Sequence, residues 1–535
     1  MTTFKVTGKN SIFTDETGFY QDSPAADSLT VDIDAFIIST RTSAIELQNT
    51  GGWTATINGT VMSTSSGDGI ELSNGAATSS KITIGAFGSV SGVNGISLGS
   101  AASLTNKGVI DGDAYGVLVS GAKTTTITNS GAIAGDAAGI RISGVGPVKI
   151  TNSATGFIDG ILDTAAVAAM TITNSGKITG TLLLPSILTN SVSNSGNIST
   201  LEFGEGKNVL TNSGSITEVN FGSNGTDIVT NSGKMSLNAF DTIELKGGND
   251  IFKNTSLTPI KVDMGAGDDL FTGGNGVETV IDASGSDKVA LGGDDDIYYA
   301  LAIIDDGTDT IDGGSGSDLY DASGAGVGVN INLDTVAHNF APITPGLTLV
   351  ASSAQQGAVK DNIKNFEYVR GSNFNDNIAG SAASNSLDGG DGADVLFGYS
   401  GNDLLRGGTG SDQLFGGAGA DSLNGGSGSD VYFIEKVTDS PVTGRDRITS
   451  FENTLDLISF QAIDANTKNG SATNDAFVYI GANVSFTGVA GQLRSYWTES
   501  GHILEGDVNG DGKADVAVEV SDPTHAIDWI QDFIL

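Results

Sequence analysis

Residues 389–433 read GGDGADVLF GYSGNDLLR GGTGSDQLF GGAGADSLN GGSGSDVYF, which are five consecutive units of nine residues. Each unit has Asp at its sixth position and a large apolar residue at its eighth. Two looser units precede them, GSNFNDNIA at 371–379 and GSAASNSLD at 380–388. Glycine at the first, second and fourth positions permits a positive-φ turn whose carbonyl oxygens point inward. The sixth-position carboxylate completes the all-oxygen shell that Ca²⁺ prefers.

This register predicts a parallel β-roll in which two units make one turn, so that aspartates 18 residues apart stack on the same side. The eighth-position side chain points inward from a very short strand. A cation is expected between each pair of stacked aspartates, beginning with Asp394 and Asp412. The predicted calcium ligands of this array, residues 371–433, are Asp376, Asp394, Asp403, Asp412, Asp421 and Asp430.

A weaker form of the pattern starts earlier, over residues 246–321. Positions 269, 278, 287 and 296 keep the nine-residue step, and positions 309 and 318 keep it again. The interval 322–370 breaks the register and is predicted to be an irregular insertion. The calcium ligands predicted for this first array are Asp250, Asp269, Asp287, Asp309 and Asp318.

The first half of the chain repeats a different phrase, most often Thr-Asn-Ser-Gly. Its Asn residues stand 18 to 23 residues apart, and an aliphatic residue or Met usually follows. Short Ile, Val and Thr runs between Asn/Ser/Gly turns indicate strands. We therefore expect a right-handed parallel β-helix over 51–245, with an axial ladder of Asn side chains. Residues 1–50 are predicted to be a cap or an assembly segment. The repeated Asn residues are 106, 129, 152, 174, 194, 212 and 231.

Residues 507–515 read DVNGDGKAD, which has the D-x-N-x-D-G-x-x-D spacing of a calcium loop. The predicted side-chain ligands are Asp507, Asn509, Asp511 and Asp515. The bidentate Glu expected at position 12 of such a loop is replaced by Val518. A hairpin turn that shares this spacing is the alternative interpretation.

The nine-residue units resemble the hemolysin-type calcium-binding repeats of RTX proteins. That resemblance implies a parallel β-roll, multiple bound Ca²⁺ ions, calcium-triggered folding outside the cell and type I secretion. Residues 434–535 resemble the C-terminal domain that caps the roll in serralysin-type proteins, and the final Asp532-Phe533-Ile534-Leu535 resembles an uncleaved type I secretion signal. The N-terminal β-helix resembles adhesin and surface-layer repeats. The expected fold class is all-β: a parallel β-helix continuing into a calcium-binding β-roll, with a C-terminal β cap.

The amino-acid composition argues against several classes of function. The 535 residues include 63 Asp plus Glu against 25 Lys plus Arg, for a formal net charge of −38, and no Cys. A nucleic-acid partner is not expected because such proteins need a basic face. The chain is not expected to span a membrane because no stretch approaches about 18 consecutive apolar residues. The N-terminus shows no cleavable export signal, which by itself would indicate the cytoplasm.

No sequence motif of a familiar enzyme accounts for the chain. It lacks HExxH, a catalytic GxSxG elbow outside the calcium turns, and the Asp-Pro-His motif of alginate epimerases; residues 51–240 hold one Arg, Arg141. The sequence therefore favours a non-enzymatic, secreted, calcium-dependent structural protein that self-assembles into a homo-oligomer or polymer as a surface layer, fibre or biofilm matrix, with cell-surface polysaccharide as a possible partner. Two alternatives remain. One is a glycan-modifying β-helix enzyme of lyase or epimerase type, and the other is a glycan-binding adhesin.

Overall fold

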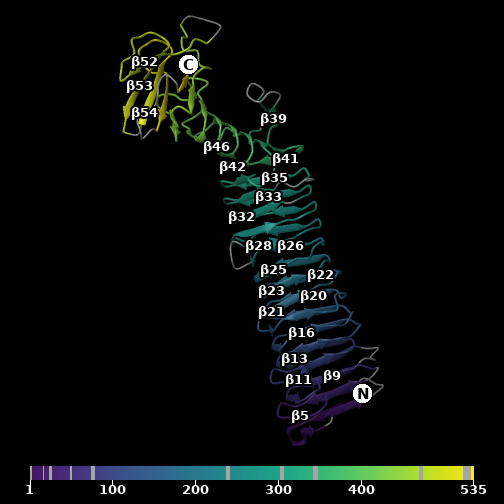
Figure 1. Ribbon diagram of the computed structural model, residues 1–535. Helices are drawn as coiled ribbons and strands as arrows, with labels where there is room; N and C mark the ends of the chain where they lie inside the picture. The colour runs from purple at the N-terminus through teal and green to yellow at the C-terminus, as the bar shows by residue number, and fades with distance from the viewer. Residues whose placement is uncertain are drawn as a thin grey trace. The chain divides into compact units, whose positions relative to one another are not determined.

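The computed structural model describes residues 3–15, 17–22, 27–48, 51–73, 79–235, 241–282, 284–301, 307–340, 347–468, 474–499, 501–521 and 532–535. The chain divides into two compact units, Met1–Gly276 (unit 1) and Val277–Leu535 (unit 2). Within the described ranges the secondary structure is strand, apart from the 3-10 helix η1 (Gly8–Asn10) (Figure 1). The expected all-β class is confirmed. No helix of the described part is long and apolar enough to cross a bilayer.

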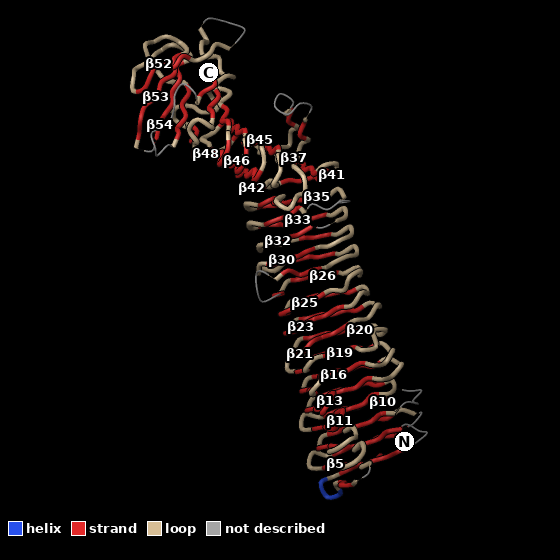
Figure 2. The backbone as a smooth tube through the Cα atoms, in the orientation of Figure 1, coloured by secondary structure: helices blue, strands red, loops and turns tan. Residues whose placement is uncertain are grey.

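Unit 1 is a stack of coils whose successive strands pair in parallel (Figure 2). One column of strands consists of β1 (Thr3–Val6), β4 (Asp27–Val31), β7 (Trp53–Ile57), β10 (Ser80–Ile84), β12 (Ala102–Asn106), β14 (Thr125–Asn129), β17 (Val148–Asn152), β20 (Met170–Asn174), β22 (Asn190–Asn194), β24 (Asn208–Asn212), β26 (Ile228–Asn231), β29 (Ile251–Asn254) and β31 (Leu270–Thr272). The second column consists of β2 (Ile12–Thr14), β5 (Phe36–Ser39), β8 (Thr60–Ser63), β11 (Ser89–Leu98), β13 (Val109–Val119), β15 (Ala132–Gly135), β18 (Phe157–Ile158), β21 (Lys177–Leu184), β23 (Asn197–Phe203), β25 (Ser215–Asn220) and β27 (Lys234–Met235).

Shorter strands complete these coils. They pair in parallel with one another or with the long strands of the second column. They are β3 (Phe19–Asp22), β6 (Ile45–Gln48), β9 (Ile70–Leu72), β16 (Ala138–Ile142), β19 (Ile161–Asp163), β28 (Thr242–Glu244) and β30 (Ile260–Asp263).

The register of unit 1 is set by side chains that alternate between the core and the surface. In the strands that end in Asn, the central aliphatic residue is fully buried, as at Ile127 and Ile150. The predicted Asn ladder is confirmed: each buried Asn donates from Nδ2 to Oδ1 of the Asn in the next coil, at 2.8–2.9 Å from Asn106 through Asn231. Asn254 adds a further rung that the Thr-Asn-Ser-Gly phrase does not reveal.

Unit 2 contains two columns of short strands, and the strands of the nonapeptide array keep the nine-residue register. The first column is β33 (Lys288–Gly293), β35 (Thr310–Ser315), β41 (Val359–Lys364), β40 (Ser353–Gln356), β37 (Val329–Asn332), β43 (Asn377–Ala379), β45 (Val395–Ser400), β47 (Gln413–Ala418), β49 (Val431–Phe433), β51 (Leu457–Ser459) and β56 (Phe533–Ile534). The second is β32 (Glu278–Asp282), β34 (Ile297–Ala300), β36 (Leu319–Asp321), β42 (Tyr368–Arg370), β44 (Ser386–Asp391), β46 (Leu404–Gly410), β48 (Ser422–Gly428), β50 (Asp446–Thr449), β55 (Val516–Val520), β54 (Gly501–Asp507), β53 (Gln492–Thr498) and β52 (Val478–Ala482).

The nonapeptide array forms the predicted parallel roll. Strands 18 residues apart pair in parallel, as in Leu396↔Leu414 and Leu405↔Leu423. The eighth-position side chains are fully buried between the two columns, including Tyr432 at the end of the array.

Part of the interval 322–370 departs from the roll, while β41 and β37 of the same interval continue the first column and pair in parallel with β35 and β43. Tyr320 of β36 pairs with Val369 of β42, as if the intervening residues were absent. Within the interval β40 pairs antiparallel with β37 and β41, and β38 (His338–Asn339) pairs antiparallel with β39 (Thr348–Leu349). Phe340 packs on the outer face of the roll with Phe397 and Phe415, whose rings stack at 4.1 Å.

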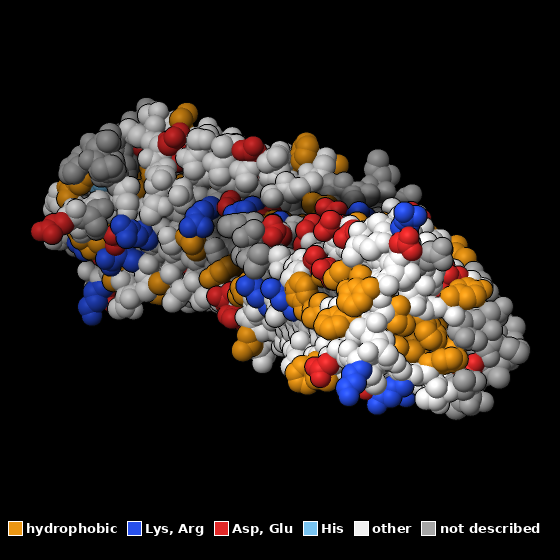
Figure 3. All heavy atoms as spheres, turned by 90° about the horizontal axis from the view of Figure 1, so that it is seen from below, with side chains coloured by type: hydrophobic (Ala, Val, Ile, Leu, Met, Phe, Trp, Pro, Cys, Tyr) orange, Lys and Arg blue, Asp and Glu red, His pale blue; other side chains and the backbone are white. Residues whose placement is uncertain are grey.

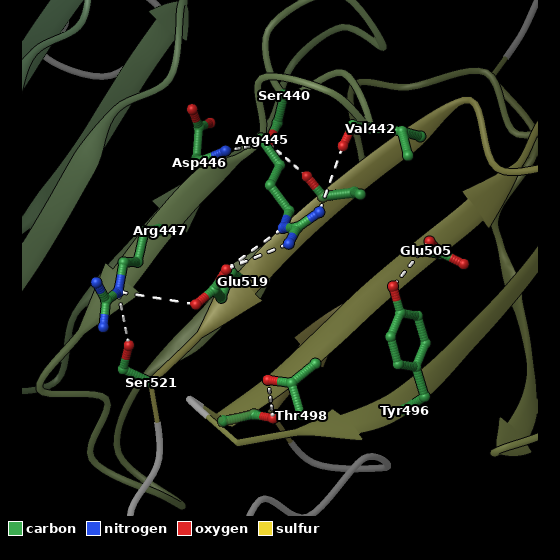
Figure 4. A network of polar contacts seen from close by, with 12 residues as sticks. Ser440, Val442, Arg445, Asp446, Arg447, Tyr496, Thr498, Glu505, Glu519 and Ser521 are labelled. Atoms are coloured by element: carbon green, nitrogen blue, oxygen red, sulfur yellow. Dashed lines mark hydrogen bonds and ion pairs between the residues drawn. The ribbon is translucent and has the colours of Figure 1, made fainter.

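The C-terminal segment is joined to the last coil by backbone pairing and charge. Strand β55 pairs in parallel with β50, and β54 and β53 follow it antiparallel. Arg445 and Arg447 both approach the carboxylate of Glu519, at 3.4 and 3.9 Å, and Ser440 donates to the carbonyl of Ala517 at 2.5 Å (Figure 4).

Asn174→Ala tests the ladder. The substitution removes the acceptor of Asn152 and the donor to Asn194, which are all buried, so the free energy of unfolding should fall by about 3 kcal/mol. The midpoint of urea unfolding of the calcium-saturated chain, followed by circular dichroism, measures the change. Asn220→Ala, at an exposed position, should change it by less than about 0.5 kcal/mol. Equal effects of the two substitutions would contradict a stabilising ladder.

Candidate calcium sites

The sixth-position side chains of the nonapeptides form two stacked columns, one on each side of the roll. In each column the Oδ1 atom accepts a hydrogen bond from the backbone N–H of the sixth residue one coil earlier. The N–H of Asp394 donates to Asp412 at 2.8 Å, and that of Asp412 to Asp430 at 3.0 Å. In the other column Asp403 donates to Asp421 at 2.8 Å. Aspartates 18 residues apart therefore lie together, as the sequence predicts.

The second carboxylate oxygen has no such partner. Oδ2 of all five of these aspartates is buried and accepts no hydrogen bond within the described chain. It points at the first-position glycine of its own unit. The place a β-carbon would take on Gly407 lies 2.3 Å from Oδ2 of Asp412 and 2.6 Å from the carbonyl oxygen of Gly425. Two acceptor oxygens face one small space, and no donor of the described chain bonds to the carboxylate oxygen there, so the site fits a hard cation with oxygen ligands.

Burial raises the pKa of these carboxyl groups. The pKa of Asp394 is raised to about 8 and that of Asp412 to about 7, chiefly because the carboxylate loses water, and the neighbouring aspartates of the column raise it further. In both cases the backbone N–H bond to Oδ1 opposes the shift. The metal-free coil thus disfavours the charged form that a bound cation would stabilise.

The two looser units differ in their hydrogen bonding. Ser372 replaces the second glycine, and its N–H and hydroxyl donate to the two oxygens of Asp376 at 2.6 and 2.8 Å. The N–H and the hydroxyl of Ser381 likewise donate to Asn385, both to Oδ1, at 2.7 and 3.1 Å. Because serine donors take up these acceptors, Asp376 presents a weaker cation site than Asp394.

Both acid columns extend beyond the last nonapeptide. The N–H of Asp421 donates to Asp446 and that of Asp430 to Asp456, both at 3.0 Å. Oδ2 of Asp446 is buried and accepts no hydrogen bond in the described chain, and burial raises its pKa to about 8. These acids follow their partners by 25 and 26 residues, so a search for a nine-residue repeat does not find them. The usable signal is Asp two residues before Ile448 and Ile458, as in the sixth and eighth positions of a unit.

The first array of unit 2 repeats the arrangement. The N–H of Asp287 donates to Asp309 at 2.8 Å, and that of Asp296 to Asp318 at 2.9 Å. Burial is the main cause that raises the pKa of Asp309 to about 9 and that of Asp318 to about 6. Asp361 and Glu367, inside the interval predicted to be irregular, continue the two columns.

Unit 1 contains the beginning of such a column. Asn208 donates to Asp227 from both its N–H and its Nδ2, at 3.1 and 2.9 Å. The N–H of Asp227 then donates to Asp250 at 2.6 Å, and that of Asp250 to Asp269 at 2.7 Å. Asp250 and Asp269 were predicted as ligands; Asp227 was not, although its Gly-Thr-Asp context echoes the pattern. Burial raises the pKa of Asp250 to about 7.

The predicted C-terminal loop brings its four side chains together, but they bond mainly to the loop itself. Asp507 accepts two backbone N–H groups, at 2.6 and 2.9 Å. Asp515 accepts two backbone N–H groups and the side-chain amide of Asn509, the last at 2.8 Å. Asp511 accepts the N–H of Lys513 at 2.9 Å. Calcium binding by this loop stays a prediction.

Comparison with known proteins agrees with this geometry. The profile of the RTX calcium-binding nonapeptide repeat matches residues 272–302, 370–405 and 397–432. The chain therefore carries RTX nonapeptide repeats, which bind multiple Ca²⁺ ions and are typical of secreted proteins. No curated protein sequence matches the chain.

Two of the solved structures with local similarity are subunits of the Azotobacter vinelandii mannuronan C5-epimerase. The AlgE6R3 subunit is 25% identical over 30% of this chain and 78% of its own, with a TM-score of 0.16. The AlgE6R2 subunit is 21% identical over 30% of this chain and 89% of its own, with a TM-score of 0.18. Similarity at this level carries no argument about what this chain does.

Asp394→Asn and Asp376→Asn form a matched pair, because both residues lie in the same column. Asp394→Asn replaces the oxygen that faces the cation space with an amide, so the calcium-saturated chain should hold at least one ion fewer. Asp376→Asn should leave the ion count unchanged, because Ser372 already occupies both oxygens. Native mass spectrometry and calorimetric titration measure the counts. Equal losses in the two variants would contradict the distinction.

The raised pKa values predict an inverse pH dependence for the calcium-free chain. A folded-state pKa above the ordinary value contributes stability that is complete below that ordinary value of about 3.8 and is lost as the pH rises through about 6 to 8. Calcium-depleted protein should therefore show more strand signal and a higher urea midpoint at about pH 5 than at about pH 8. Saturating calcium should restore order at the higher pH. A calcium-free fold that strengthens with rising pH would contradict this.

Proposed function

We propose that this chain is a secreted, calcium-dependent extracellular structural protein that self-assembles at the cell surface, as a surface layer, fibre or biofilm matrix. The observation that supports assembly is an apolar surface on the first coils of unit 1. Strand β2 pairs with β5 only, among the described residues, and so leaves one strand edge open. Open strand edges and exposed apolar patches are where protein chains associate.

The exposed side chains of these coils are large. Phe13 is 68% exposed, Ile33 53% and Phe36 42%. Figure 3 shows hydrophobic side chains gathered over this end of unit 1. Exposed aromatic rings beside an unpaired strand edge are unfavourable in a soluble monomer. We therefore propose that a second copy of the chain covers this surface.

In this proposal, calcium determines when the chain folds and assembles. At low calcium the net charge of −38 and the unneutralised aspartates keep the roll expanded, which suits export through a type I system. Outside the cell, where modules of this kind bind at about 10⁻⁴–10⁻³ M Ca²⁺, ions neutralise part of the charge and the coils stack. The terminal Asp532-Phe533-Ile534-Leu535 is the proposed export signal.

The double variant Phe13→Asp/Phe36→Asp tests assembly. Charge on this surface should raise the protein concentration at which calcium-dependent particles form by about tenfold or more, which corresponds to about 1.4 kcal/mol per contact. Sedimentation velocity and negative-stain electron microscopy, each with and without calcium, measure it. Ile187→Asp is the matched control, because Ile187 is 70% exposed in a loop elsewhere on unit 1.

Two results would contradict the proposal. One is a chain that stays monomeric at every protein and calcium concentration. The other is undiminished assembly of the double variant. A monomer that cleaves or modifies a uronate polymer would support the enzymatic alternative, and saturable sugar binding without assembly would support an adhesin.

A further inference from the structure

The first array does not keep glycine at the first position of every unit: Met264 and Leu291 are apolar residues there, and one unit carries an acid. The unit at 282–290 reads DASGSDKVA, so Asp282 stands where the five regular units have glycine. In those units a β-carbon at this position would lie within 2.5 Å of Oδ2 of the unit's own sixth-position aspartate. Asp282 therefore places a carboxylate in the space that a cation would share in a regular coil.

The side chain turns into that space. Asp282, Asp287 and Asp309 each offer one carboxylate oxygen, and these three atoms lie within 4.8 Å of one another. Their residues are 3%, 1% and 1% exposed. The N–H of Asp287 donates to Asp309, so the two sixth-position acids are the ordinary column and Asp282 is the addition.

The hydrogen bonds leave oxygens of this cluster unused. The Tyr298 hydroxyl donates to Oδ2 of Asp282 at 2.5 Å and so fixes the orientation of that carboxylate. Oδ1 of Asp282 and Oδ2 of Asp309 are buried and accept no hydrogen bond in the described part of the chain. In the same part of the chain, neither residue forms an ion pair with Lys or Arg. Buried carboxylates without a counter-charge are strongly unfavourable.

We propose that Asp282, Asp287 and Asp309 form a three-carboxylate calcium site that binds more tightly than the two-carboxylate sites of the nonapeptide roll. The oxygen-only donor set suits Ca²⁺ rather than Zn²⁺ or Cu²⁺, which take nitrogen or sulfur. Calcium affinity rises with the number of charged ligands and with the rigidity of the site. Asp282 supplies the extra charge, and the hydrogen bond from Tyr298 supplies the rigidity.

The position of this site gives it a role in ordering the array. It lies at the first turn of unit 2, and the Asp309 N–H continues the same column to Asp361 at 3.1 Å. An ion bound here at low calcium holds two coils in register before the weaker sites fill. The inference concerns ion binding within one chain, so it stands or falls separately from self-assembly.

A proton is the competing occupant. If one of the three carboxyl groups is protonated, it can donate to another, and no ion is needed. The two cases differ in one respect: removal of the Asp282 charge abolishes the tight ion in the first and leaves calcium binding unchanged in the second.

Terbium luminescence in the full-length chain separates these cases. Tb³⁺ takes oxygen ligands as Ca²⁺ does and emits when a nearby tyrosine is excited, and Tyr298 is in direct contact with Asp282. The wild-type chain should show one early phase of sensitised emission, well below the concentration that fills the other sites. Calcium should displace this phase last.

Asp282→Gly restores a regular first position, and Asp282→Asn keeps the shape but removes the charge. Both should weaken the early phase by about tenfold or more while the later phases stay in place. Tyr298→Phe should reduce the early emission, and calorimetry should show a calcium ion bound less tightly than in the wild type, because the hydroxyl no longer orients Asp282. Asp391→Asn, an exposed acid of the second array, is the control and should change neither.

Unchanged early midpoints in both Asp282 variants, with circular dichroism of the calcium-loaded chain like that of the wild type, would overturn the proposal. So would a wild-type chain whose ions all bind in a single weak phase. Asp282→Gly keeps the test decisive if Asp282→Asn does not fold, because it reproduces the first-position glycine of the five regular units at 389–433.

Discussion

From β12 onward the described coils bury Asn or Asp side chains in their turns, and the structure depends on how the second polar atom of each of these side chains is satisfied. An asparagine brings its own donor: Nδ2 of Asn208 bonds to the carbonyls of Gly204 and Gly206 at 3.0 and 2.9 Å and to Asp227 at 2.9 Å. An aspartate in the same place has an oxygen where the amide nitrogen would be. That oxygen faces carbonyls and needs a positive charge from outside the chain.

The column Asn190, Asn208, Asp227, Asp250 shows the change within one unit. Asn190 donates to Asn208 at 3.1 Å, and Asn208 donates to Asp227. At Asp227 and Asp250 the donors of the previous coil reach Oδ1, but among the described residues nothing donates to Oδ2. Coils with asparagine satisfy the buried side chain by hydrogen bonds within the chain, whereas coils with aspartate leave a buried oxygen that a cation can bind.

The sequence predicts the parts of the structure that repeat at a fixed spacing. The nonapeptides reveal both the acids at position six and the buried residues at position eight, and the Asn phrase reveals the ladder in unit 1. Serine at position two is harder to interpret, since only the structure shows Ser372 donating to both oxygens of Asp376. Tyr399 also occupies a second position. It adopts φ of +73°, the left-handed conformation that its glycine counterparts adopt without strain.

The acids that sequence reasoning missed have the same contact as those it found, at irregular spacings. The bond from a backbone N–H to the carboxylate of the next coil joins residues 18 apart in the regular array, 22 apart at Asp287 and Asp309, and 25 apart at Asp421 and Asp446. Across the insertion it spans 52 residues, from Asp309 to Asp361.

A coil is therefore defined by this contact rather than by its length. Because the carboxylate must meet one particular amide, extra residues can leave the stack as loops or hairpins as long as the next acid returns to its place. Loop length adds little free energy once the ends are held together, since the closure term grows only logarithmically. The bond between the backbone N–H and the acid of the next coil holds those ends. The roll can thus carry a large insertion without losing register. A register inferred from sequence spacing alone ends at such an insertion, although the column of acids continues beyond it.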